Sequence, residues 1–452
     1  MNLTLRELRD CFEGAIPSSI ATCALDGTPN VALLSQVHFV DDFHVALSFQ
    51  FFNTTRKNIL ANPQAVAHVV DPSTAAHYRL QLRYLRTETE GPLFEKMKAK
   101  LAGIASHTGM SKVFRLQGSD VYEVLHIEHV FGCRDHVDRA RLDLLSGLRH
   151  CISRLAECRD LSILFDTALQ GLAEYCDIQH AMLLMFDPDR DRLYTVATHG
   201  YRESGIGSEI RVGEGIIGVA ARERTPVRIG HAAQEYLYSR AMREGFAKCN
   251  AAEALETEIP IPGLADSGSQ IAVPLILPTA RKSRLLGILY LESPKDMRFG
   301  YEEEDALVAL ADYLALAIEL HNQSAEAVET NNAIQPESVK VQGALVTVRH
   351  YAVDHSVFIG SDYLIKGVAG AIIWKLLCAY AELKRTEFSN RELRLDPALR
   401  LPDISDNLEA RLVLLQRRLA ERCTFIAIEK TGRGRFRLNI SRPLQLDAIA
   451  GA

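Results

Sequence analysis

The stretch GEGIIGVAARERTPVRIGH, residues 213–231, spaces its glycines as Gly-x-Gly-x-x-Gly-x-Ala. This spacing can form the phosphate-binding turn of a dinucleotide site. Such a turn also needs a preceding strand, a following helix and an acidic residue about 20 positions further on. Here the chain passes within a few residues into another short strand, PVRIG. We therefore reject a dinucleotide-binding fold for this segment.

The sequence on either side of this stretch predicts an α/β unit. Helical periodicity covers about residues 139–176, strand patterns such as AMLLMFD and QIAVPLIL follow, and a long helix is expected from about residue 302 to 322. With the glycine string, these elements resemble a GAF domain, and we assign residues 139–323 to it with its connecting helices. The resemblance implies a small-ligand sensor or a dimerising spacer. The long insertion at 232–270, with Cys249, suits a pocket lid.

Residues 1–138 are rich in short strand patterns separated by turn signals, which indicates a small barrel with helices. Within it, FFNTTRKNILANP (51–63) brings two threonines and two cations to the start of a short helix. A helix N-terminus carries unpaired N–H groups and the positive end of the helix dipole, so it attracts phosphate. Simple N-capping by Asn53 or Thr54 is the alternative explanation.

Residues 8–130 resemble the split-barrel flavoproteins related to pyridoxamine-phosphate oxidase, through the turn at Asp26–Gly27 and the Asn-Pro that ends the short helix. The resemblance implies bound FMN and a homodimer. Thr54 and Thr55 stand where the oxidases often have Arg-Lys, so vitamin B6 oxidation is disfavoured. The residues expected at the cofactor are Ser48, Phe49, Gln50, Asn53, Thr54, Thr55, Arg56, Lys57 and Gln81.

Haem is the second cofactor considered for the barrel, because His126, His129 and His136 follow one another closely. His126 and His129 fall on opposite faces of a strand, since side chains alternate along it. The pattern thus disfavours haem relative to FMN.

The C-terminal segment begins after a polar linker at 324–342 and covers residues 343–452. Lys and Arg outnumber Asp and Glu there, although the whole chain carries a net charge of -6. In the helix predicted at 406–422, four leucines form one apolar stripe, and a second, mostly basic stripe carries three arginines. A basic hairpin follows. Such features suit DNA, where arginine pairs with guanine edges and phosphates.

LQRRL (415–419) and GRGRFRL (432–438), in this order, resemble the recognition helix and wing of the winged-helix output domain of bacterial response regulators. The resemblance covers about 100 residues and implies DNA as a partner. The residues expected to contact DNA are Asn407, Arg411, Arg418, Arg422, Lys430, Arg433 and Arg435. A surface that binds another protein is the alternative.

Composition limits the remaining functions. The nine cysteines never occur as CxxC, which favours reduced cytosolic thiols and disfavours zinc. No apolar run approaches the ~20 residues of a membrane span, so we expect a cytoplasmic protein. No paired carboxylates, Ser-His or thiolate arrangement indicates catalytic residues.

We expect an α+β multidomain chain with an N-terminal split β-barrel, a central GAF domain and a C-terminal winged helix-turn-helix. Its predicted function is one-component transcription regulation by a small ligand or redox state. The alternative is a flavin-dependent oxidoreductase with accessory domains. A scaffold without cofactor is the third hypothesis.

Overall fold

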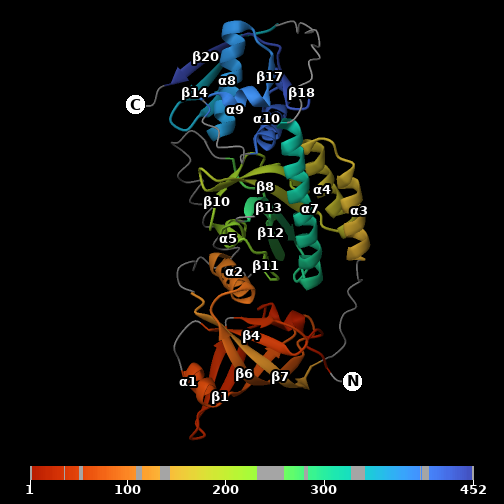
Figure 1. Ribbon diagram of the computed structural model, residues 1–452, viewed down its shortest axis with the longest axis vertical. Coiled ribbons are helices and arrows are strands. Elements are labelled where there is room, and N and C mark those ends of the chain that lie inside the picture. Colours follow the sequence, from red (N-terminus) through yellow and green to blue (C-terminus); the bar gives the residue numbers. More distant parts are fainter. Residues whose placement is uncertain are drawn as a thin grey trace.

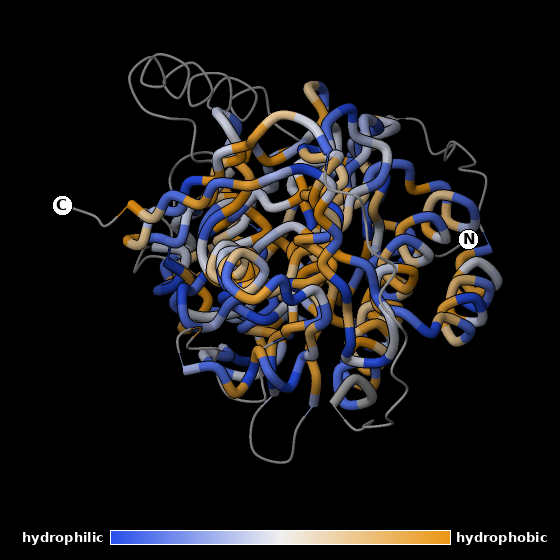
Figure 2. Tube along the Cα trace, turned by 90° about the horizontal axis from the view of Figure 1, so that it is seen from above, coloured by the Kyte–Doolittle hydropathy of each residue, from blue (hydrophilic) through white to orange (hydrophobic). Residues whose placement is uncertain are grey.

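The computed structural model describes residues 3–34, 36–49, 54–107, 115–132, 143–231, 259–278, 283–326, 342–397, 399 and 407–449. Three units follow one another along the long axis, from the N-terminal sheet to the C-terminal one (Figure 1). Seen along that axis, hydrophobic segments gather in the middle and hydrophilic ones at the periphery (Figure 2). Among the described residues, no helix combines the length and the apolar character that a membrane crossing needs.

The N-terminal unit is one antiparallel sheet in the order β2-β1-β5-β6-β7-β4-β3. Its strands are β1 (Ser18–Cys23), β2 (Pro29–Leu34), β3 (Val37–Phe39), β4 (His44–Phe49), β5 (Gln64–Val70), β6 (His77–Glu88) and β7 (Gly118–Phe131). The two outermost strands, β2 and β3, are consecutive in the chain and separated by two residues. Both edges must therefore approach each other, so the sheet curls into a half-barrel, where the sequence predicts a split β-barrel.

The N-terminal unit also contains η1 (Arg9–Phe12), α1 (Thr54–Ala61) and α2 (Pro92–His107). Its core is the inward row of the strands, with Val45, Leu80 and Leu82 fully buried. Because side chains alternate along a strand, the opposite row faces outward. On edge strand β2 this outward row leaves Val31 and Leu33 exposed.

The middle unit is an antiparallel sheet in the order β10-β9-β8-β13-β12-β11. Its strands are β8 (His180–Asp187), β9 (Arg192–His199), β10 (Glu209–Arg211), β11 (Val227–Ile229), β12 (Ser269–Leu277) and β13 (Arg284–Ser293). Helices α3 (Leu144–Ala156), α4 (Leu161–Cys176) and α7 (Tyr301–Glu326) cover one face, and α5 (Gly215–Glu223) covers the other (Figure 1).

The glycine string of this unit forms a tight turn into α5. Gly213 has a φ of +88° and donates its N–H to the carbonyl of Gly218 at 2.7 Å. A Cβ on Gly218 would lie 2.3 Å from the carbonyl oxygen of Arg211, so only glycine fits there. Strand β11 then pairs antiparallel with β12. No parallel βαβ crossover forms here, which agrees with the rejection of a dinucleotide-binding fold.

Over its described residues, the C-terminal unit has two small sheets, β16-β15-β14-β20 and β17-β19-β18, around three helices. Its elements are β14 (Val346–Tyr351), β15 (Ser356–Ile359), β16 (Asp362–Ile365), α8 (Gly367–Leu383), β17 (Glu387–Ser389), α9 (Asn390–Leu395), α10 (Leu408–Arg422), β18 (Ile426–Gly432), β19 (Arg435–Ile440) and β20 (Leu444–Ile449). The β18–β19 hairpin directly follows α10, and its turn is made by Arg433 and Gly434.

Helix α2 joins the N-terminal and middle units. On one side, Met97 and Leu101 pack with Ala46 and Val121 of the half-barrel. On the other side, α2 lies on α5 and β11 so closely that a Cβ on Gly103 would come within 2.4 Å of a Val227 methyl carbon. The small residue permits this close approach.

A buried charge cluster, Glu13, Lys100, Arg228 and Glu304, completes this joint. Glu13 lies 3.0 Å from Lys100 and 3.0 Å from Arg228, and Arg228 donates to Glu304 at 3.0 Å. Each side chain is at most 10% exposed. Burial alone would raise the pKa of Glu304, but Arg228 and Lys96 outweigh it and hold this pKa below its usual value. The cluster thus brings two carboxylates and two basic side chains together in the buried joint.

Substitution Arg228→Met should destabilise the chain by about 3–5 kcal/mol, because it leaves two carboxylates buried without their shared cation. Thermal and urea unfolding followed by circular dichroism would measure the loss. The matched control is Arg79→Met, which removes a half-exposed pair with Glu128 and should cost at most about 1 kcal/mol. Equal losses in both variants would contradict a stabilising role for the cluster.

Candidate functional site

Helix α10 lies at the joint between the middle and C-terminal units. Leu408, Leu412, Leu415 and Leu419 are buried, as the apolar stripe predicts. Most of the opposite side of the helix is covered as well, since it contacts α4, α7 and β9 of the middle unit, and exposure begins only in the last turn, at 420–422 (Figure 1). Helix α10 is therefore enclosed between the middle and C-terminal units.

Two arginines of α10 bind the middle unit directly. Arg411 forms an ion pair with Asp187 at 3.1 Å, and these side chains are only 4% and 5% exposed. Arg417 donates to the carbonyl oxygens of Val196 and Ser162, both at 3.0 Å, and to Asp166 at 2.8 Å. An arginine presents several N–H groups in a rigid fork, which suits this multiple contact. Sequence analysis missed Arg417 and its partners.

Lys430, on strand β18, makes a third contact. Its ammonium lies 2.7 Å from Asp160 and 3.4 Å from Glu409. Asp160 also caps α4 by accepting the N–H of Ser162 at 2.8 Å. Burial would raise the pKa of Asp160, but Lys430 and the cap outweigh it and hold this pKa below its usual value. Asp160 is thus an anion that serves both units.

The residues predicted to contact DNA are not gathered on one open surface. Asn407 is buried and caps α10 by accepting the N–H of Ala410 at 3.1 Å. Arg418 is 3% exposed and donates to the carbonyl of Leu364 at 2.8 Å, so it stabilises its own unit. Arg411 is covered by the middle unit. Contact of these residues with DNA stays a prediction.

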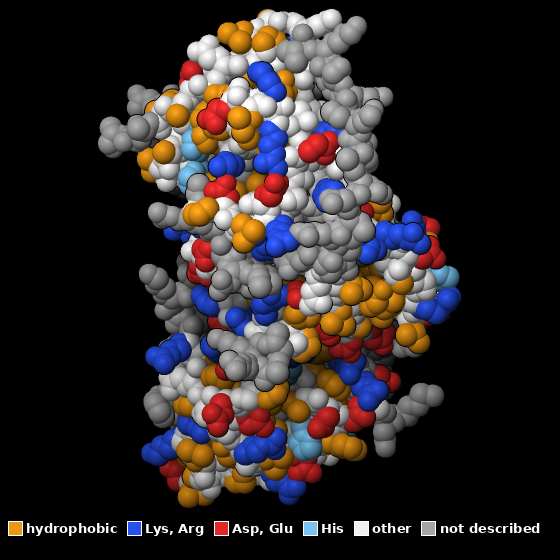
Figure 3. Space-filling model, turned by 45° about the horizontal axis from the view of Figure 1, so that its top comes forward, with side chains coloured by type: hydrophobic (Ala, Val, Ile, Leu, Met, Phe, Trp, Pro, Cys, Tyr) orange, Lys and Arg blue, Asp and Glu red, His pale blue; other side chains and the backbone are white. Residues whose placement is uncertain are grey.

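Four of these seven residues are more accessible. Arg422, Lys430 and Arg433 are exposed, and Arg435 is half-buried. On the face in Figure 3, Lys and Arg side chains of the described residues are interspersed with Asp and Glu rather than forming one basic surface.

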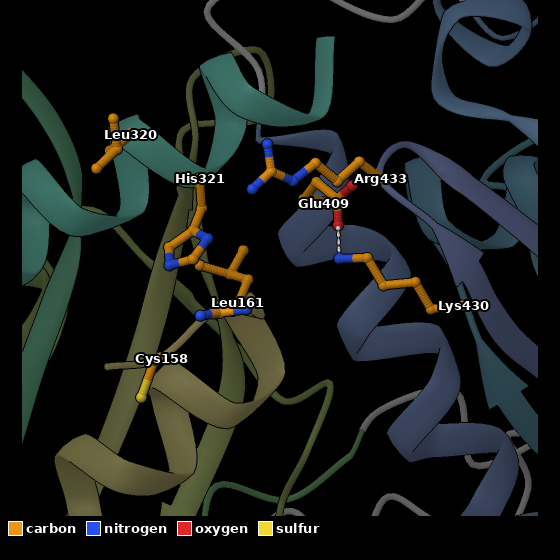
Figure 4. Close-up of a pocket in the computed structure, with 8 residues that line it drawn as sticks. Cys158, Leu161, Leu320, His321, Glu409, Lys430 and Arg433 are labelled. Carbon is orange, nitrogen blue, oxygen red and sulfur yellow. Dashed lines mark hydrogen bonds and ion pairs between the residues drawn. The ribbon is translucent and has the colours of Figure 1, made fainter. Parts of the chain in front are cut away.

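A cavity of about 200 Å³ opens at this joint (Figure 4). Its walls come from the α3–α4 turn and α7 on one side and from α10 and the β18–β19 hairpin on the other. It is lined by Cys158, Arg159, Leu161, Leu320, His321, Glu409, Lys430 and Arg433.

The predicted phosphate site of the half-barrel lies at α1, and two of its residues are engaged internally. The hydroxyl of Thr55 accepts from the amide of Asn30 at 2.9 Å. Arg56 is ion-paired with Asp120 and lies over the ring of Phe49, 4.6 Å from its centre. The charge of Arg56 is therefore compensated. Sequence analysis missed Asp120, which lies 64 residues away.

The other predicted cofactor residues differ in position. Thr54 and Lys57 are exposed, and Gln50 and Asn53 lie outside the described residues. Ser48 lies opposite Ser119 in the β4–β7 pair, and both hydroxyls are buried without a hydrogen-bond partner.

Ser48 and Gln81 do not share a surface with Phe49 and Arg56. Ser48 precedes Phe49 on β4 and thus points to the opposite face of the sheet from Phe49, over which Arg56 lies. Gln81 is exposed on β6 and lies six residues from Thr87, whose hydroxyl donates to Asp120. Six residues of a strand span about 20 Å, so Gln81 is far from Asp120.

The residues fit FMN in part. The unpaired hydroxyls of Ser48 and Ser119 lie on the opposite face of the sheet from Phe49 and Asp120, so they are not part of this site. The exposed Thr54 and Lys57 are available for a phosphate. These groups, rather than Arg56, would hold the cofactor.

Of the histidines considered for haem, the two that the structure describes lie in different surroundings. His126 is exposed, whereas His129 packs on Tyr78 with ring centres 5.5 Å apart. His136 lies outside the described residues. Within the parts of the chain that the structure covers, no cluster of His, Cys, Asp or Glu could hold a metal ion.

Comparison with protein families matches residues 160–318 to the GAF domain family. The middle unit is therefore a GAF domain, as the sequence predicts. No curated protein sequence matches the chain.

Several solved structures are similar to parts of the chain. An FMN-binding protein from Syntrophomonas wolfei is 18% identical, over 29% of this chain and 90% of that one, with a TM-score of 0.25. The GAF domain of an Acinetobacter phosphoenolpyruvate-protein phosphotransferase is 20% identical, over 42% and 97%, with a TM-score of 0.30. Free methionine-R-sulfoxide reductase from Neisseria meningitidis is 21% identical, over 42% and 95%, with a TM-score of 0.31.

Proposed function

We propose that the chain is a one-component transcription regulator, in which the GAF domain senses a small ligand and the C-terminal unit binds DNA as a winged helix. The element order supports this proposal, because three helices are followed by a hairpin and a final strand. In this assignment α10 is the recognition helix and the β18–β19 hairpin is the wing.

The observation that carries the proposal is the attachment of α10 to the GAF domain. The helix assigned to DNA recognition is held by Asp187 and Asp166 of a ligand-sensing fold. DNA cannot reach Arg411 or Arg417 while these contacts persist. The arrangement is thus a closed state, and a ligand that favours an open state would increase DNA binding.

Release of α10 changes which residues meet DNA. Arg411 and Arg417 become available, and Arg422 and Arg433 are exposed already. Arg418 stays bound to the carbonyl of Leu364 within its own unit, so we assign it a structural role.

The double variant Asp166→Ala/Asp187→Ala should raise DNA affinity at least tenfold, because it removes both carboxylates that hold the arginines of α10. Fluorescence anisotropy with a pool of random DNA duplexes at one fixed salt concentration would measure the change.

The control for this experiment must lose the same negative charge, since charge alone alters binding to DNA. Asp312→Ala, combined with removal of a second exposed carboxylate, serves this purpose, because Asp312 is exposed on α7. If the double variant binds no more tightly than the control, the closed state is refuted. If neither protein binds DNA, the regulator proposal fails.

FMN is the cofactor we propose for the half-barrel, where it would supply electron or hydride transfer when bound. The exposed Thr54 and Lys57 at the start of α1 support it. A flavin-dependent oxidoreductase is the alternative function. It would require turnover as well as binding.

Titration with FMN should give a saturable change in the visible spectrum, and Thr54→Ala/Lys57→Ala should weaken binding at least tenfold by removing the free phosphate ligands. Gln81→Ala is the matched control, since Gln81 lies far along β6 and should have little effect. A spectrum of free FMN at saturating cofactor would exclude a flavoprotein.

A homodimer through the half-barrel is the assembly we infer. Val31 and Leu33, on the outward row of β2, are 71% and 79% exposed, and such neighbouring apolar residues mark contact surfaces.

Substitution Leu33→Asp should convert dimers to monomers, because a carboxylate cannot be buried there without a partner. Light scattering would measure the mass. Leu145→Asp, at another exposed leucine, is the control. A wild-type monomer at all concentrations would refute the dimer.

A further inference from the structure

The cavity between the GAF domain and the C-terminal unit contains two uncompensated arginines, one from each unit. Arg159 belongs to the α3–α4 turn, and Arg433 lies at the turn of the β18–β19 hairpin. In the parts of the chain described, neither has a hydrogen bond or an ion pair. Figure 4 shows Arg433 pointing across the cavity toward the side of His321.

The other charged groups at the cavity are Lys430 and two carboxylates, Glu409 and Asp160, so they leave one negative charge against the two arginines. Glu409 accepts from Lys430 and also from the amide of Asn390 at 2.7 Å, and Lys430 is further neutralised by Asp160. Burial, together with the nearby Lys430, lowers the pKa of His321, so its imidazole is neutral near pH 7. The cavity therefore has an excess of positive charge that comes from its two arginines.

We propose that this cavity binds a small anion, either a phosphate or a dicarboxylate, held between Arg159 and Arg433. Guanidinium groups pair with both anions through two parallel hydrogen bonds. A cavity of about 200 Å³ is smaller than the ~300–1,000 Å³ of sites for drug-sized ligands, so the ligand is small. Leu161 and Leu320 form the apolar wall against its carbon skeleton.

This site would regulate the attachment of α10, a consequence that rests on the proposed function. Arg159 and Arg433 belong to different units, so one anion can contact both only in the closed state. Binding therefore stabilises that state and opposes DNA, and DNA in turn weakens anion binding. Arg433 is also a predicted DNA contact, and its guanidinium cannot serve both ligands.

Calorimetric titration of the full chain with inorganic phosphate, and separately with malonate, would test the site at constant ionic strength. We expect one saturable site per chain for at least one anion. Arg159→Ala and Arg433→Ala should each weaken it at least tenfold. Both side chains are exposed, so folding should be unaffected, which circular dichroism would verify.

The matched control is Arg202→Ala, which removes an exposed arginine of the GAF domain outside the cavity and should leave binding unchanged. Tighter binding of phosphate would identify a phosphorylated ligand, and tighter binding of malonate a dicarboxylate. Absence of saturable binding, or equal binding by the wild type and both cavity variants, would overturn the site.

The regulatory consequence is measured separately. Saturating anion should lower the DNA affinity of the wild type at least threefold and leave that of Arg159→Ala unchanged, at constant ionic strength. An unchanged wild type would overturn the coupling. If the chain binds no DNA at all, the proposed function fails, while the titration alone still decides the anion site.

Discussion

The buried ion pair between Arg411 and Asp187 is the constraint on which the arrangement of α10 depends. Each side chain is almost wholly removed from water, so neither can lose its partner without leaving an uncompensated buried charge. Partial separation is therefore unfavourable. The GAF domain and α10 should be either fully in contact or fully apart, with both charges rehydrated. Such a two-state joint is what a regulated contact requires.

The joint between the half-barrel and the GAF domain also depends on buried ion pairs. Arg228 lies between Glu13 of the half-barrel and Glu304 of α7, and all three are buried. Helix α2 fits against β11 because Gly103 has no side chain. The half-barrel and the GAF domain are thus held by charge and by close packing. A change in one of them alters the surface on which the other rests.

The sequence pattern of each segment predicted its helices and strands. The roles of several residues, however, depend on partners that are far away in the chain. The apolar stripe of α10 identified its inner face, and the glycine string with its flanking strands identified the GAF domain. The same helical periodicity assigned Arg411 to a free face, because Asp187 lies more than 200 residues earlier in the chain. Arg56 was likewise assigned to the cofactor site, but it forms an ion pair with Asp120, 64 residues away in the chain. Asn407 is a residue type typical of helix caps, and that simpler role is the one observed.

Helix α7 spans both joints. Glu304 in its first turn belongs to the charge cluster at the half-barrel, and His321 near its end lines the cavity beside Arg433. These residues are 17 positions apart, or about 25 Å along a helix. One continuous helix thus carries residues of both joints, so a shift of α7 at one joint also moves its residues at the other. Helix α7 therefore gives a direct structural connection between the half-barrel and the β18–β19 hairpin.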